Sequence, residues 1–156
     1  MRLVTLAIAS TAIVLIALPA TQAPALAHAA QTEAAPAATG TLTITVTGYS
    51  AAEGKVLIGV YDKAGWNGGE PVLGGTVDLA AGETTLTIEG LPAGRYGIKA
   101  IHDANDNGEM DMNPFGMPTE AFAFSNNAPA SMGPASWADA AFELTASGAE
   151  QTLTIR

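Results

Sequence analysis

Cysteine is absent from this chain of 156 residues. No disulfide can therefore stabilise the fold and no acylated cysteine can anchor it to lipid, so we expect the core to depend on side-chain packing alone. Basic residues are also scarce, because six lysines and arginines stand against fifteen acids and give a formal net charge of −9. Such a surface disfavours nucleic acid and anionic membranes as partners and favours divalent cations.

Long apolar runs are scarce too. After Met1 and Arg2, residues 3–18 are apolar or small, a run that is too short for a stable membrane span and typical of a secretory signal peptide. Small-x-small patterns at Ala25-Leu26-Ala27 and Ala27-His28-Ala29 predict that residues 1–29 form the signal, with cleavage after Ala27 or Ala29. We therefore expect a periplasmic or secreted protein that is not embedded in a membrane.

The segment that follows, residues 30–40, consists mostly of small residues and is low in complexity, which predicts a flexible leader. Residues 41–156 have the usual size of one domain that buries its own core. We expect this domain to be a monomer.

Alternation of threonine with apolar residues is the clearest structural pattern. It runs without a break over residues 41–47 and returns at 84–88 and 152–155, as expected for strands buried on one face. Further short strands are expected at 55–61, 77–79, 96–102, 121–124 and 141–144, separated by glycine-rich turns that include Gly74-Gly75. The strongest helical signal, Ser136-x-x-Asp139, resembles a capping box and predicts a single turn.

These patterns predict an all-β fold, an antiparallel Greek-key β-sandwich of seven or eight strands that is Ig-like or prealbumin-like. The expected core consists of the inward-facing aliphatic residues of the alternating strands. They are Leu42, Ile44, Val46, Val56, Ile58, Val60, Leu86, Ile88, Ile98, Leu153 and Ile155.

Oxygen-bearing side chains are concentrated in residues 103–111, directly after an expected strand. Asp103, Asn105, Asn107 and Asp111 occupy the first, third, fifth and ninth positions of an EF-hand-type loop, and Gly108 occupies the sixth, where the chain turns sharply. This spacing points the side chains inward together, and hard cations such as Ca²⁺ bind six to eight oxygens.

The twelfth position of this loop holds Pro114, which has no side-chain oxygen, so Asp111 or Glu120 has to supply the missing ligand. The sequence thus predicts Ca²⁺ bound by Asp103, Asn105, Asn107, the Glu109 carbonyl, Asp111 and Glu120. We expect weak affinity, on the order of 10⁻⁴ to 10⁻³ M, as in extracellular modules. The simpler alternative is a polar turn in which Asx residues and glycine reverse the chain.

Several motifs around this loop resemble a known bacterial family. The segment His102-Asp103-x-Asn105-x-Asn107-Gly108-x-x-Asp111 and the later segments 113–120 and 124–127 carry the resemblance. So do Gly90-Leu91-Pro92-Ala93-Gly94-Arg95-Tyr96 and residues 133–142. Together they resemble the domain of unknown function DUF2141 over most of residues 41–156. This resemblance implies a small secreted β-sandwich and no established activity.

The step into the strand before the loop also resembles prealbumin-like and carboxypeptidase-regulatory-like modules. By that analogy the acidic loop lies at one pole of the sandwich.

Copper is a second possible metal. Met110, Met112, Met117 and Met132 lie close to His102 in sequence, and cleavage after Ala27 would expose His28 as an N-terminal chelator. Thioethers and imidazoles are the soft ligands that copper prefers. The simpler alternative is that these methionines fill gaps beneath a long loop.

An enzyme is the weaker interpretation, because no nucleophile elbow, phosphate-binding glycine loop or carboxylate pair with an acid–base partner can be found in the sequence. We expect Trp66 and Trp137 to anchor loops or the core, since a chain with few aromatics gives no support for a carbohydrate platform. Two interpretations remain open: a binding or structural module that presents a calcium-ordered loop to a protein or glycan, and a metal-handling protein or enzyme that uses His102 and the neighbouring acids.

Overall fold

The structure is a computed structural model that describes residues 38–49 and 51–156. The predicted signal peptide at residues 1–29, its cleavage site and all but the last three residues of the predicted leader lie outside this part of the chain. The described residues form β1 (Thr39–Thr47), β2 (Lys55–Tyr61), β3 (Leu73–Asp78), β4 (Thr85–Pro92), β5 (Gly94–Asp103), β6 (Phe122–Phe124), the 3₁₀ turn η1 (Ser125–Asn127), α1 (Trp137–Ala140), β7 (Phe142–Leu144) and β8 (Ala149–Thr154). The all-β prediction is confirmed.

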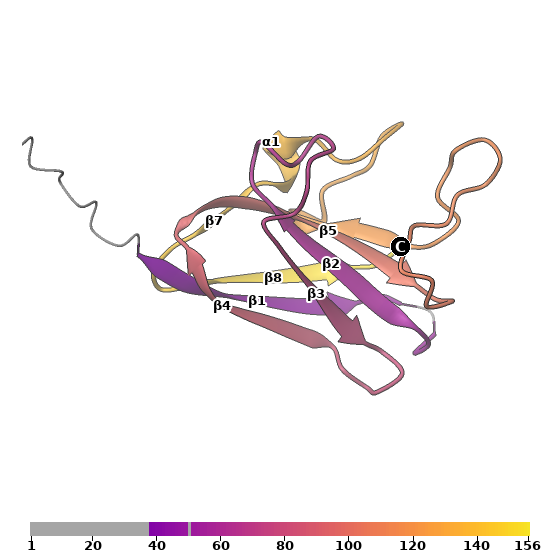
Figure 1. The fold of residues 1–156 in the computed structure, drawn as a ribbon, viewed down its shortest axis with the longest axis horizontal. Helices are drawn as coiled ribbons and strands as arrows, with labels where there is room; N and C mark the ends of the chain where they lie inside the picture. The colour runs from indigo at the N-terminus through magenta and orange to yellow at the C-terminus, as the bar shows by residue number, and fades with distance from the viewer. Residues whose placement is uncertain (1–37, 50) are drawn as a thin grey trace, which may run out of the picture. The chain divides into compact units, whose positions relative to one another are not determined.

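The strands form two sheets that face each other (Figure 1). One sheet has the order β4-β1-β8, and the other has the order β3-β2-β5-β6, with β7 also paired to β5. The chain crosses between the sheets after β1, β3, β4 and β7, so that β2 lies beside β5 and β1 lies beside β4. This is the expected sandwich with Greek-key crossovers. Among the described residues, no helix is long and apolar enough to cross a membrane.

The three threonine-rich segments form β4, β1 and β8 and make up one entire sheet. Their apolar residues point inward and all of their threonines remain exposed or half-buried. The pairing of β1 with β8 is parallel, with Leu42 opposite Ala149 and Thr47 opposite Thr154, which departs from the purely antiparallel expectation. Parallel neighbours need a crossover connection, and the other sheet lies between these two strands in the chain order.

Side chains from both sheets fill one core. Of the predicted core residues, nine are buried, whereas Leu86 and Ile88 are only partly buried because β4 is an edge strand. Leu79, Leu91 and Leu144 join them from strand ends and short segments. The predicted inward register is therefore confirmed.

Gly74 and Gly75 were expected in a turn but lie within β3, opposite Gly59 and Ile58 of β2. A Cβ at Gly75 would meet Leu86 Cδ2 at 2.5 Å, so glycine here lets the edge strand of the other sheet pack closely. A second small difference is that β1 begins at Thr39, before the expected start at residue 41. The single helical turn is confirmed, and Ser136 Oγ accepts a hydrogen bond from the Asp139 N–H at 3.2 Å.

A second apolar cluster covers the outer face of the larger sheet. Trp66 is buried there, with its ring in edge-to-face contact with Tyr61, Phe124 and Trp137. Its indole N–H donates to the Ala135 carbonyl at 2.9 Å, which ties two loops together. The expected anchoring role of both tryptophans is confirmed.

Candidate functional site

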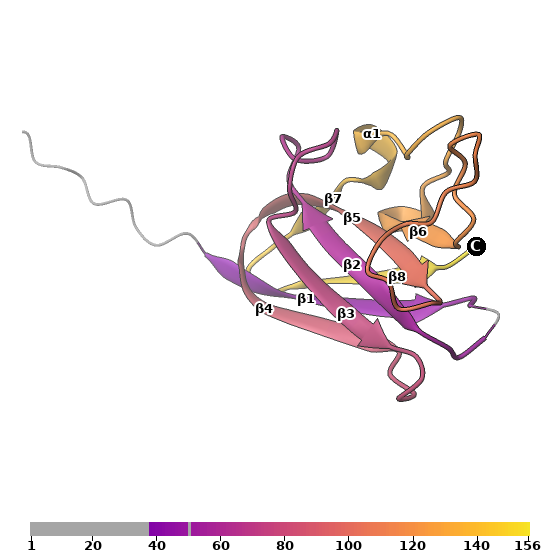
Figure 2. The same cartoon turned by 45° about the vertical axis from the view of Figure 1, so that its right-hand side comes forward.

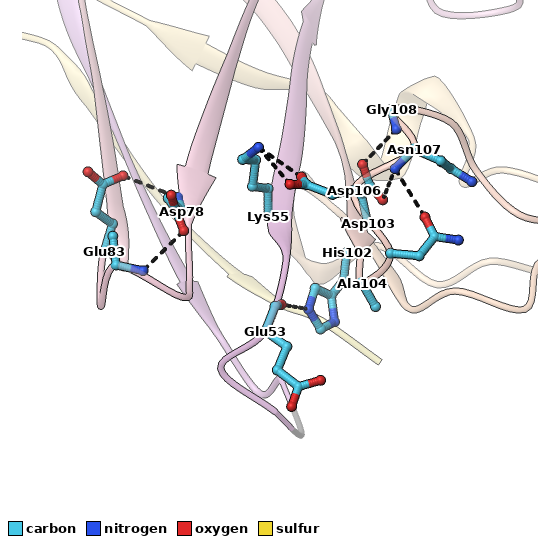
Figure 3. A network of polar contacts seen from close by, with 12 residues as sticks. Glu53, Lys55, Asp78, Glu83, His102, Asp103, Ala104, Asp106, Asn107 and Gly108 are labelled. Carbon is cyan, nitrogen blue, oxygen red and sulfur yellow. Dashed lines mark hydrogen bonds and ion pairs between the residues drawn. The ribbon is translucent and has the colours of Figure 1, made fainter.

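The acidic loop begins where β5 ends, at Asp103, and lies at the same pole of the sandwich as the β1–β2 connection (Figures 1 and 3). Asp103 is 1% exposed. Its two carboxylate oxygens accept hydrogen bonds from the backbone N–H groups of Asn107, at 3.1 Å, and Gly108, at 2.8 Å. Gly108 has a φ of 82°, the left-handed conformation that the sharp turn requires. A buried carboxylate therefore holds the loop in a tight curl.

The two asparagines continue this curl. Asn105 Oδ1 accepts a hydrogen bond from the Asn107 N–H at 3.1 Å, and Asn107 Oδ1 accepts one from the Glu109 N–H at 2.8 Å. Each asparagine thus forms an Asx turn, in which its side-chain oxygen accepts from the backbone N–H two residues further on. Glu109 takes part through its backbone N–H, whereas the prediction assigned its carbonyl to the metal.

Asp111 and Glu120 close the loop from its far end. Asp111 accepts hydrogen bonds from the side-chain amides of Asn105, at 2.7 Å, and Asn107, at 3.0 Å. Glu120 accepts hydrogen bonds from the backbone N–H groups of Ala104 and Asp111, each at 3.1 Å. The structure thus brings Glu120 beside the loop, where a substitute for the ligand that Pro114 cannot supply is needed.

A basic side chain from β2 lies beside the loop. Lys55, at the start of β2, forms an ion pair with Asp106 at 2.8 Å, and both side chains are largely exposed. The hydrogen bond and the charge of Asp106 raise the pKa of Lys55. Asp106 has a φ of 65°, so its carboxylate leaves the loop on the side of Lys55. Asp106 is therefore an outward-facing acid and does not belong to the predicted ligand set.

The hydrogen-bonding side chains of the loop all carry oxygen atoms, and oxygen is the ligand atom that Ca²⁺ prefers. In the described part of the chain, no group of three or more His, Cys, Asp or Glu side chains is arranged to hold a metal ion. A calcium ion in this loop would therefore need the Asn105 and Asn107 amide oxygens and backbone carbonyls in addition to carboxylates.

The sequence model of a bacterial family described as "Uncharacterized protein conserved in bacteria (DUF2141)" matches residues 44–152. The chain belongs to this family. The match extends from β1 into β8 and includes the whole acidic loop, and it confirms the resemblance inferred from the motifs. Comparisons with curated proteins and with solved structures gave no match.

In this DUF2141 domain, His102 is buried and belongs to the inner face of β5. One of its ring nitrogens, Nε2, lies 2.8 Å from the Glu53 carbonyl oxygen, a contact that ties the β1–β2 connection to the strand (Figure 3). Side chains alternate along a strand, so Lys99, three residues earlier, points to the opposite face. The methionines gather on the Lys99 side, and the structure therefore does not bring His102 and the methionines together.

The methionines of the DUF2141 domain line a separate cavity. Met110, Met112, Met117 and Met132 surround it together with Phe122 and Phe124 of β6. The sequence showed that the methionines cluster, but the aromatic floor and the contribution of Lys99 could not be predicted, because they depend on how β5 and β6 pair. Met112 and Met117 remain 58% and 59% exposed, so they do not fill a buried gap beneath the loop.

Proposed function

We propose that this DUF2141 protein is an exported binding module, periplasmic or secreted, whose acidic loop is ordered by Ca²⁺ and presented at one pole of the sandwich to a protein or glycan. The observation that carries this proposal is the interlocked set of Asp103, Asn105, Asn107, Asp111 and Glu120, in which the spacing expected of a calcium loop is combined with a carboxylate supplied from downstream.

Calcium suits this set for a physical reason. Asp103, Asp111 and Glu120 repel one another when no cation lies between them, and hydrogen bonds from N–H groups offset that repulsion only in part. A divalent ion would take over the role that the amide groups of Asn105 and Asn107 play toward Asp111. Magnesium would bind less well, because its small octahedral shell tolerates a flexible loop poorly.

The test is a pair of thermal melts, in millimolar calcium and in chelator. If only the folded chain binds the ion, calcium at ten times Kd stabilises the protein by about 1.4 kcal/mol. We expect this to raise Tm by a few degrees in a domain of this size, measured by calorimetry or circular dichroism.

A matched pair of variants makes this test specific. Asp103→Ala with Asp111→Ala removes two loop carboxylates, whereas Glu89→Ala with Glu143→Ala removes the same charge from exposed strand positions. Calcium should stabilise the parent and the second variant and leave the first unchanged. Equal melting of the parent in both buffers would show that the loop is a polar turn alone.

Copper handling is the alternative function, and its ligand set is narrower than the sequence implied. His102 faces away from the methionines, and His28 lies outside the described residues. The four thioethers around one cavity are what favours copper, since Cu(I) binds soft sulfur ligands. A Cu(I) titration followed by competition with a chelator of known affinity tests it, and unchanged chelator spectra would exclude it.

A further inference from the structure

The methionine-lined cavity lies on the outer face of the larger sheet, against β5 and β6. Its walls come from two loops, residues 110–118 and 130–134, which lie next to one another in Figure 2. The cavity is a groove open to solvent with a volume of about 640 Å³, within the range of sites that hold small molecules. Thioethers, two phenylalanines and two prolines form most of its surface.

Lys99 is the one charged residue among the described residues that line this cavity. It is half-buried, and its ammonium donates a hydrogen bond to the Trp66 carbonyl at 2.6 Å. The ammonium also lies 4.4 Å from the centre of the Tyr61 ring and 4.9 Å from that of the Trp66 ring. An ammonium has three protons to donate, so the carbonyl does not exhaust it.

Lys99 also has no acid to neutralise it. Within residues 38–49 and 51–156 the ion pair is Lys55 with Asp106, and Lys99 contacts no carboxylate. Burial lowers the pKa of Lys99, because the charged form loses water and gains no counter-ion. An anion brought to the edge of the cavity would supply that counter-ion.

From the cavity and the lysine together, we propose that this face of the domain binds amphipathic carboxylates, molecules with a flexible apolar chain and one anionic head group. The chain lies among the methionines and phenylalanines, and the head group accepts a hydrogen bond from the Lys99 ammonium. Methionine side chains are unbranched and adjust easily, which suits a ligand without a fixed shape. A net negative protein would otherwise repel an anion, so the isolated lysine determines where the head group binds.

The experiment is isothermal titration calorimetry of the folded protein with decanoate and dodecanoate below their critical micelle concentrations, and with 1-decanol below its solubility limit. All titrations are made in chelator, so that calcium cannot precipitate the fatty acid or order the acidic loop. We expect decanoate to bind more tightly than 1-decanol, and dodecanoate more tightly than decanoate by about tenfold for the two added methylene groups.

Two pairs of variants separate the head-group contact from the apolar wall. Lys99→Met should lower the affinity for decanoate roughly ten- to hundredfold and leave the affinity for 1-decanol unchanged. Lys63→Met, at an exposed position away from the cavity, should change neither affinity. Met117→Gln should lower the affinities for decanoate and for 1-decanol alike. Val72→Gln, at another partly exposed apolar position that does not line the cavity, is its control.

Retained binding of 1-decanol shows that the Lys99→Met cavity is intact, so a variant that merely misfolds is recognised. A folded parent that binds neither fatty acid, or that binds decanoate and 1-decanol equally, overturns the proposal. A third outcome is that the protein binds no decanoate but binds Cu(I), and that Met117→Gln abolishes the Cu(I) binding. The cavity would then be a thioether metal site and the carboxylate proposal would be wrong. Because the titration needs no calcium, its outcome is independent of the melts that test the acidic loop.

Discussion

Asp103 combines two properties that rarely occur together, a carboxylate and nearly complete burial. The backbone N–H groups of Asn107 and Gly108 compensate its charge, and that charge contributes to the raised pKa of Lys55. Buried carboxylates persist only where such donors are fixed by the surrounding chain. The curl of the loop therefore depends on this one side chain even before any ion is considered.

Asp103→Asn should lower the free energy of unfolding by about 1–3 kcal/mol in chelator, because the amide replaces one accepting oxygen with a donor that faces an N–H group. Urea denaturation measures the loss. Asp106→Asn is the control, since that side chain is exposed and should change stability by less than about 0.5 kcal/mol. Similar losses in the two variants would mean that burial of Asp103 contributes little.

Gly97 in β5 lies directly beneath the tryptophans of the outer cluster. An added Cβ would meet Trp66 Cζ3 at 2.6 Å and Trp137 Cζ3 at 3.3 Å. Gly97→Ala should therefore cost about 1–3 kcal/mol through overpacking. Gly74→Ala in β3 meets nothing closer than the Ile58 carbonyl oxygen at 3.5 Å, and its stability should match or exceed that of the parent. Chemical denaturation of both variants checks the contrast, and a stable Gly97→Ala protein would show that Trp66 moves freely.

At the scale of elements, what could be predicted follows the range of the interaction. Alternation along one strand is local, so the strands of the threonine-rich sheet and their inward register were found from residues such as Leu42, Ile44 and Val46. β3 lacks this pattern, and it begins at Leu73 although a strand was expected only at 77–79. The Asx spacing of the loop is also local, and it correctly brought Asp103, Asn105, Asn107 and Asp111 together.

Partners between elements could not be predicted in the same way. The parallel pairing of β1 with β8 and the strand position of Gly75 depend on contacts across the sandwich, and glycine alone predicts a turn equally well. The cavity depends on the pairing of Lys99 with Phe124, two residues on different strands. Neither residue carries a local signal of binding.

The contact between β2 and the acidic loop also sets the charge near the proposed ion. Lys55 neutralises Asp106 and adds a positive charge beside Asp103. Lys55→Gln should therefore raise calcium affinity severalfold at low salt, and added salt should reduce this gain by screening. Calcium titrations at two ionic strengths check this prediction, with Lys63→Gln as the control. A loss of affinity would mean that the ion pair is needed to shape the loop.

At the scale of the whole molecule, the chain combines a folded domain with an N-terminal segment that has the composition of an export signal. We predict that export removes residues up to Ala27 or Ala29 and releases the domain with a short leader. N-terminal sequencing of the protein from the periplasm or medium measures the cleavage position. An intact Met1 terminus recovered from the membrane fraction would contradict this prediction.

Residues 110–112 contribute both to the acidic loop and to the wall of the methionine-lined cavity. The Asp111 carboxylate accepts hydrogen bonds within the acidic loop, while the methionines on either side of it line the cavity. An ion that fixes Asp111 would also fix one wall of the cavity, so a ligand would lose less conformational entropy on entering. Thermodynamic linkage then makes the effect reciprocal: whatever factor calcium adds to ligand affinity, the ligand adds to calcium affinity. In the calcium concentrations of an extracellular medium, this three-residue stretch would make ligand uptake depend on the ion outside the cell.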